Sequence, residues 1–157
     1  MNKLKKIVVT GGSGFVGKPL IEFLLEKKFH VIALQHKSNF TDIRDPNFFV
    51  ADIQHVMAKN GSILKDATAL VHLAAKTHGR LHDNQKTYLE YKKINVELTE
   101  KICSLSIANN IKKIIYLSSI KTIGESSPIH GFEENTITNP KDAYGRTKLE
   151  AEKLIEN

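Results

Sequence analysis

Short apolar runs alternate along this chain with longer stretches of helical periodicity. The apolar runs are expected to form strands, at residues 6–10, 30–34, 48–51, 69–74 and 113–118. Helices are expected at residues 14–27, within residues 88–109, and from Ala143 onward. Because nearly all-apolar strands are typical of parallel sheets covered on both faces by helices, the pattern predicts a doubly wound α/β fold.

The long helix expected within residues 88–109 carries one apolar stripe. Ile94, Leu98, Ile102 and Leu105 recur there at helical spacing, so the stripe is expected to face a core or a subunit interface. Cys103 is the single cysteine of the chain, which excludes an intrachain disulfide and favours a buried, unreactive side chain.

Length and charge exclude several classes of protein. A chain of 157 residues with 41% apolar residues predicts one domain, here spanning residues 1–157. The net charge of +6 is dispersed, and only three arginines occur, so nucleic acid is not expected as a partner, whereas an anionic small molecule is compatible. No apolar run is long enough to cross a bilayer and no signal peptide is evident, so no membrane partner and a cytoplasmic location are expected.

A glycine-rich turn joins the first expected strand to the first helix. Its sequence is Thr-Gly-Gly-Ser-Gly-Phe-Val-Gly at residues 10–17. Glycines at this spacing permit a tight turn, close approach of a pyrophosphate and close packing of the helix, whose N-terminus supplies N–H donors. The turn therefore predicts a dinucleotide-binding domain of the Rossmann type, with cofactor contacts from Gly11, Gly14, Phe15, Val16 and Gly17.

The second strand leaves the choice of dinucleotide open. An acidic residue about 20 positions after the glycines normally binds the adenosine ribose, but here the strand ends in Gln35, His36 and Lys37. Lys37 or a protonated His36 would pair with the 2′-phosphate of NADP, whereas Gln35 could still bind the hydroxyls of NAD. We expect NAD as cofactor, with NADP as the alternative.

Two further motifs carry acid–base chemistry. Tyr144 and Lys148 are four residues apart, which places them on one face of a helix. Ser118 and Ser119 follow the fifth strand, at the edge where open α/β sheets bind ligands, so the motifs are expected to converge on one site. His78, His82 and Asp83 lack the further ligands that a closed metal site needs, and no metal is expected.

Together these motifs resemble the extended short-chain dehydrogenase/reductases, specifically the NAD-dependent epimerase/dehydratase family. The resemblance covers nearly the whole chain. It rests on the glycine turn, on Ser-Ser-Ile-Lys-Thr-Ile-Gly at residues 118–124, and on Tyr-Gly-Arg-Thr-Lys at residues 144–148. The last two segments are most similar to the surface-polysaccharide branch of the family, which contains UDP-sugar 4-epimerases and 4-keto-sugar reductases.

The resemblance implies roles for individual residues. It assigns catalysis to Ser119, Tyr144 and Lys148, a structural role to Asn95, and substrate contacts to Thr77 and Ser119. It adds cofactor contacts from Tyr144 and Lys148 and from a set flanking the third and fourth strands, namely Asp52, Ile53, Leu73, Ala74 and Ala75. Tyr144 would exchange a proton with the sugar hydroxyl while hydride passes between the sugar and the nicotinamide.

The resemblance also implies a nucleotide-diphosphate sugar as substrate and a homodimer as one possible assembly. The alternatives are an NADP-dependent 4-keto-sugar-nucleotide reductase and a non-catalytic dinucleotide-binding fragment. Members of the family continue past the Tyr/Lys helix into a smaller domain that grips the sugar, but this sequence ends within that helix without a stop signal. We therefore expect a fold truncated before the substrate domain, with little or no turnover by the 157 residues alone.

Overall fold

The computed structural model describes residues 5–36, 43–77 and 84–156. The chain divides into two compact units. The first unit comprises Met1–Ala74 and Lys101–Leu117, and the second comprises Ala75–Glu100 and Ser118–Asn157. Each unit is described by itself.

The first unit contains a five-stranded parallel sheet. Its strands are β1 (Lys6–Thr10), β2 (His30–Gln35), β3 (Phe48–Asp52), β4 (Ala67–His72) and β5 (Ile114–Tyr116). They lie in the order β3-β2-β1-β4-β5 and every pairing is parallel. The chain thus starts at the middle of the sheet, winds outward to β3, and returns to the other side of β1, which confirms the doubly wound α/β fold.

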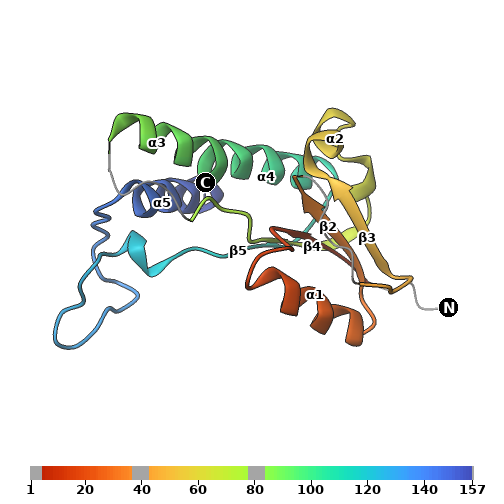
Figure 1. Cartoon of the computed structure of the whole chain (residues 1–157), viewed down its shortest axis with the longest axis horizontal. Coiled ribbons are helices and arrows are strands. Elements are labelled where there is room, and N and C mark those ends of the chain that lie inside the picture. The colour runs from red at the N-terminus through yellow and green to blue at the C-terminus, as the bar shows by residue number, and fades with distance from the viewer. Residues whose placement is uncertain (1–4, 37–42, 78–83, 157) are drawn as a thin grey trace. The chain divides into compact units, whose positions relative to one another are not determined.

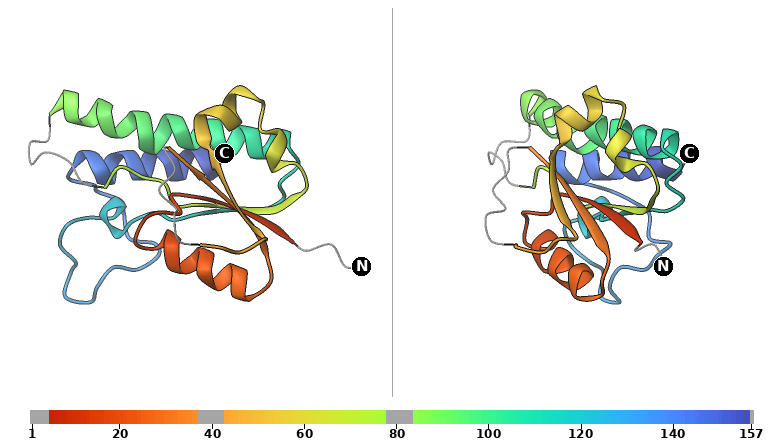
Figure 2. Two further views of the ribbon diagram at one scale, coloured as in Figure 1. Left: turned by 45° about the vertical axis from the view of Figure 1, so that its right-hand side comes forward. Right: turned by 90° about the vertical axis from the view of Figure 1, so that its right-hand side faces the viewer.

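Helices cover both faces of this sheet. Figure 1 and Figure 2 show α1 (Gly17–Glu26) on one face, and residues 101–108 of α4 (Leu98–Ala108) on the opposite face. On the α1 face, Ile21 and Leu25 pack into a buried apolar cluster with Ile7, Val9, Val31, Ala33 and Ala69. The short helices α2 (Ile53–Ala58) and η1 (Ser62–Leu64) follow β3.

The outer strands are less buried than the sequence predicts. In β1, β2 and β4 most residues are buried, but β3 and β5 are half-buried or exposed at every position. Phe49 in β3 and Ile115 in β5 are exposed apolar residues. The expectation that all strands are covered on both faces is therefore wrong for these two, because each lies at an edge of the sheet and has one neighbouring strand.

The second unit is built on two helical segments. One is continuous from α3 (Gln85–Lys92) through η2 (Lys93–Glu97) into the first turn of α4, and the other is α5 (Ala143–Glu156). Figure 1 and Figure 2 show α3 and α5 side by side and running in the same direction. A short helix, η3 (Ile120–Thr122), contacts α5.

The η2 segment is a π-helical turn, and it shifts the buried face of the long helix. A π turn holds one extra residue, so side chains beyond it are rotated relative to a regular helix. Ile102 is fully buried as predicted, but Ile94 and Leu98 are only half-buried, and polar Asn95, Thr99 and Ser106 lie on the buried side. The predicted apolar stripe is therefore only partly correct. Cys103 is buried as expected.

Candidate functional site

Packing explains two of the three motif glycines. Gly11 has a positive φ of 67°, and a Cβ atom there would lie 2.7 Å from the Ala74 nitrogen. Gly17 begins α1, three residues later than predicted, and a Cβ there would lie 2.3 Å from the Gly11 carbonyl oxygen and 2.6 Å from the Gly12 Cα. The last glycine of the motif thus allows α1 to pack against the turn itself.

Gly14 has a different environment. A Cβ there would meet one neighbour, the Gly11 oxygen at 3.2 Å, and its φ lies outside the left-handed region. Its N–H donates to the same oxygen at 3.0 Å. The fold therefore does not strictly require glycine here, and the predicted close approach of a pyrophosphate to Gly14 remains a prediction. The adjacent Phe15 is 96% exposed and Val16 is exposed, so the turn presents apolar side chains beside its backbone donors.

A buried hydrogen-bond network supports the glycine turn from β4. The hydroxyl oxygen of Thr10 accepts from the backbone N–H groups of Leu73 and Ala74, both at 3.2 Å. With those bonds accepted, the hydroxyl hydrogen is directed to His72 Nδ1, 2.6 Å away. This assigns the neutral His72 ring its proton on Nε2. Thr10 therefore fixes the segment that the sequence associates with the cofactor.

Gln35 has a buried amide donor that a bound polar ligand could satisfy. It ends β2 and is 7% exposed, yet its Nε2 atom has no hydrogen-bond partner among the described residues. A buried amide donor without a partner is costly in a folded protein. A ribose hydroxyl of a dinucleotide would satisfy it, so the residue fits the predicted adenosine-binding role. Lys37 lies outside the described residues.

Asp52 and Ile53 have clear structural roles that the sequence interpretation missed. Asp52 ends β3, and its carboxylate accepts the His55 N–H at 2.9 Å, which caps α2. Ile53 is buried in the core. An Asp directly before a short helical pattern is a recognisable N-cap signal. Their predicted contact with adenine remains a prediction.

In the second unit, Tyr144 and Lys148 lie one turn apart on α5. Lys148 is 2% exposed, and burial lowers its pKa to about 8, while Glu152 acts in the opposite direction. Tyr144 is half-buried, and its ring meets the Tyr91 ring edge-on at 6.3 Å. Tyr144 and Lys148 thus lie on one helix at the predicted spacing, and the deep burial of the lysine is an additional finding.

Ser119 belongs to the same unit and precedes η3. Its hydroxyl oxygen accepts the Lys121 N–H at 3.3 Å. Because that contact uses a lone pair, the hydroxyl hydrogen remains available to a substrate oxygen. The neighbouring Ser118 has a buried hydroxyl without a partner among the described residues.

Asn95 forms hydrogen bonds both to the backbone of Lys76 and to α5, the helix that carries Tyr144. Its side chain accepts the Lys76 N–H at 2.7 Å, and its Nδ2 donates to the Lys76 oxygen at 3.2 Å and to the Thr147 hydroxyl at 3.0 Å. Thr147 in turn donates to the Ala143 oxygen at 2.8 Å. Asn95 therefore has the structural role that the resemblance assigned, and it fixes the backbone between Ala75 and the exposed Thr77.

The predicted site residues thus fall into two groups. The first unit holds the glycine turn with Gln35, Asp52, Ile53, Leu73 and Ala74, and the second holds Ala75, Thr77, Ser119, Tyr144 and Lys148. Among the described residues there is no cluster of three metal-ligating side chains. His78, His82 and Asp83, which the sequence interpretation considered for a metal, lie outside those residues.

Replacing Lys148 with Met is expected to stabilise the protein at pH 7. The lysine's folded-state pKa of about 8 lies below the ordinary 10.5, so the unfolded chain binds more protons between these pH values. Burying the charged ammonium therefore lowers the free energy of unfolding fully below pH 8, and this loss of stability disappears as the pH rises toward 10.5. We expect Lys148→Met to increase the free energy of unfolding at pH 7 by about 1–3 kcal/mol. We also expect the variant's stability to increase less between pH 8 and pH 10.5 than that of the unsubstituted protein.

Urea unfolding at pH 7 and pH 10 measures both effects. Lys153→Met, on an exposed face of the same helix, is the matched control and should change the free energy of unfolding by less than about 0.5 kcal/mol. An unchanged or lower stability of Lys148→Met at pH 7 would show that other contacts outweigh the cost of burying the charge.

Comparison with known families identifies the class of protein. The family model described as the NAD dependent epimerase/dehydratase family matches residues 7–157. The chain belongs to this family, and the family assignment made from the motifs is confirmed. Its members are enzymes, and the predicted nicotinamide cofactor agrees with the family's NAD dependence.

Individual relatives include enzymes of two substrate classes. The chain is 33% identical over 155 residues to a UDP-glucose 4-epimerase of Vibrio cholerae, covering 96% of this chain and 46% of the relative. It is 26% identical over 160 residues to a decarboxylating sterol-4-alpha-carboxylate 3-dehydrogenase of Dictyostelium discoideum, covering 97% and 48%. The chain therefore spans about half the length of the curated relatives it matches.

Solved structures agree with the fold. A UDP-glucuronic acid 4-epimerase from Bacillus cereus, in complex with NAD, superposes with a TM-score of 0.79 at 27% identity. The match covers 95% of this chain and 50% of that one. A UDP-N-acetylglucosamine 4-epimerase from the same species gives a TM-score of 0.78 at 26% identity, covering 97% and 48%. In the part of the chain that the structure describes, no helix is both long and apolar enough to span a membrane.

Proposed function

We propose that this chain supplies the NAD-binding and catalytic residues of a UDP-sugar 4-epimerase. The observation that carries the proposal is the buried Lys148 one helical turn from Tyr144, in the same compact unit as Ser119. A buried lysine is costly to a fold unless its charge is used. The relatives named as UDP-sugar 4-epimerases support the choice of substrate class over sterols.

The residues have distinct roles in the proposed reaction. Tyr144 would take the proton of the sugar C4 hydroxyl, with Lys148 one helical turn away on the same helix. Ser119 donates a hydrogen bond to the same sugar oxygen and orients it. NAD, when bound, would supply a reversible acceptor for the C4 hydride. Tyr144 would return its proton to the C4 oxygen, which restores the hydroxyl in the inverted product.

The glycine turn would hold the pyrophosphate of the cofactor, with Gly14 at the closest approach. Gln35 would donate its unpartnered amide hydrogen to the adenosine ribose. NAD suits an epimerase because the hydride is returned and no net reductant is needed. A 4-keto-sugar-nucleotide reductase would instead consume one reduced dinucleotide in each turnover.

The test is a turnover assay with UDP-glucose and UDP-galactose. We expect interconversion of the two, observed by NMR, with no net change in absorbance at 340 nm. Consumption of NADPH with a 4-keto sugar nucleotide would support the reductase instead. Dinucleotide binding by the complete translation product without any turnover would favour a non-catalytic binding module.

The assay should compare the 157-residue chain with the complete translation product of its gene. The 157 residues cover about half of the relatives' length, so we propose that they bind NAD alone but turn over little sugar nucleotide. Robust turnover of sugar nucleotide by the 157 residues alone would contradict this proposal.

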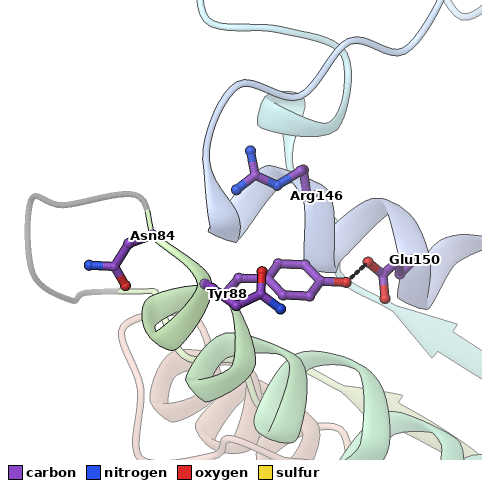
Figure 3. A pocket seen from close by; sticks show the side chains of 5 residues that line it. Asn84, Tyr88, Arg146 and Glu150 are labelled. Atoms are coloured by element: carbon purple, nitrogen blue, oxygen red, sulfur yellow. Dashed lines mark hydrogen bonds between the residues drawn. The ribbon is translucent and has the colours of Figure 1, made fainter.

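We further propose that α3 and α5 form a dimer contact. A pocket of about 370 Å³ lies between them, lined by Asn84, Gln85, Tyr88, Arg146 and Glu150. Figure 3 shows how these side chains lie. The Tyr88 hydroxyl donates to Glu150, and this bond raises the pKa of Tyr88. Leu89, the residue after Tyr88 on α3, is 54% exposed and offers an apolar contact to a second copy of the chain.

Leu89→Asp is expected to convert a dimer into a monomer, because a carboxylate would be desolvated in the contact. Sedimentation velocity measures the change, and Ile107→Asp, an exposed apolar position on α4, is the matched control. An unsubstituted protein that sediments as a monomer at micromolar concentration would contradict the proposal.

A further inference from the structure

One cluster of charged residues in the second unit has no part in the proposed chemistry. Lys121 lies in η3, two residues after Ser119, and its Nζ contacts Asp142 Oδ2 at 2.7 Å and Glu125 Oε1 at 3.0 Å. Asp142 directly precedes α5, two residues before Tyr144. The Lys121–Asp142 pair therefore joins the segment that carries Ser119 to the segment that carries Tyr144.

The two carboxylate oxygens of Asp142 serve different partners. Oδ1 accepts the Gly145 N–H at 2.7 Å and so caps the first turn of α5. Oδ2 receives the Lys121 ammonium. Burial alone would raise the pKa of Asp142, but the Gly145 and Lys121 hydrogen bonds lower it overall, so the pair is charged at neutral pH.

Backbone packing supports the same connection. A Cβ at Gly145 would lie 2.5 Å from the Lys121 carbonyl oxygen and 3.0 Å from Pro140 Cβ. Glycine therefore allows α5 to touch η3 directly. On the other side of Lys121, the Thr122 N–H and hydroxyl both donate to the Ser119 oxygen, at 3.1 and 2.9 Å. Ser119 is thus fixed to η3, and η3 is fixed to the start of α5.

We propose that Lys121 and Asp142 are positioning residues that hold the Ser119 hydroxyl in register with the Tyr144 phenol. This inference rests on the proposed function. The pair touches no reacting atom. It acts through the two side chains that it connects, because a displacement of about 1 Å between catalytic groups can reduce the rate as much as 100-fold.

Two substitutions separate positioning from capping. Asp142→Asn keeps an oxygen for the Gly145 N–H but removes the ion pair, and Lys121→Met keeps the side-chain length but removes the charge. In the turnover assay each is expected to lower kcat about tenfold while KM and the NAD dissociation constant stay within about twofold. The double variant should have a kcat no lower than that of either single variant, because the two substitutions remove the same contact.

Two further variants separate the Asp142 contact of Lys121 from its contact with Glu125. Glu125→Gln removes the other partner of Lys121 and should leave kcat unchanged, while Lys121→Arg should retain most of it. A surface ion pair contributes little to stability, so the thermal midpoint should move little. Unchanged kcat in both single variants, or a loss of kcat that only follows the loss of folded protein, would overturn the proposal.

A second measurement does not depend on turnover. Amide hydrogen exchange in the 157-residue chain reports whether η3 is held, and both single variants should speed exchange at Lys121 and Thr122 about tenfold relative to Glu125→Gln. Unchanged exchange would overturn the proposed connection. Faster exchange in the two variants, together with no turnover of sugar nucleotide by the complete translation product, would refute the proposed function but keep the connection.

Discussion

Tyr144→Phe is expected to lower kcat for UDP-sugar interconversion about 100- to 10,000-fold while leaving NAD binding nearly unchanged. A positioned general acid–base group contributes a factor of this size. The substitution removes the phenolic oxygen but keeps the ring that meets Tyr91 edge-on at 6.3 Å, so the fold should be unaffected. Steady-state kinetics and a fluorescence titration with NADH measure the two quantities.

Tyr88→Phe is the matched control for this prediction. Tyr88 also donates a hydrogen bond within the second unit, to Glu150 of α5, but it has no part in the proposed proton transfer. We expect its removal to leave kcat within about twofold. If Tyr144→Phe and Tyr88→Phe behave alike, Tyr144 is not the proton-transfer group and the proposed mechanism is wrong.

Gly17→Ala is expected to destabilise the first unit by about 3 kcal/mol or more. The new methyl group would lie 2.3 Å from the Gly11 oxygen and 2.6 Å from the Gly12 Cα. Both neighbours are backbone atoms, so no change of side-chain rotamer can relieve the overlap, and α1 must move away from the turn. Chemical unfolding followed by circular dichroism measures the loss.

Gly14→Ala provides the comparison within the same motif. Its methyl group would meet the Gly11 oxygen at 3.2 Å, so the free energy of unfolding should change by less than about 1 kcal/mol. If the turn binds a pyrophosphate, the same methyl group should still weaken NAD binding about tenfold or more. Equal stability losses in both variants, or undiminished NAD binding by Gly14→Ala, would contradict these assignments.

The sequence predicted the fold class because it rests on local patterns. Apolar runs, a glycine turn and helical periodicity are read over a few residues each, and all five predicted strands are present, with boundaries shifted by up to two residues. The start of α1 was wrong by three residues, because the turn through Ser13 continues to Val16 before the helix begins.

The candidate site was predicted only where a motif has fixed spacing. Tyr144 and Lys148 are on one helix, so their separation follows from helical geometry alone. The roles of Lys121, Asp142 and Thr147 were missed, because each depends on a contact between segments that are distant in the chain. The Asp before α5 was nevertheless a visible capping signal.

By itself, the sequence determined the doubly wound fold, the glycine turn and the Tyr/Lys pair, since these depend on backbone preference and local spacing. Tertiary structure alone decided that Gly11 and Gly17 are required by packing while Gly14 is not, that Gln35 is buried with an unpartnered amide, and that Lys148 is buried deeply enough to lower its pKa. Burial and close approach depend on what other segments place around a residue, and no local pattern contains that information.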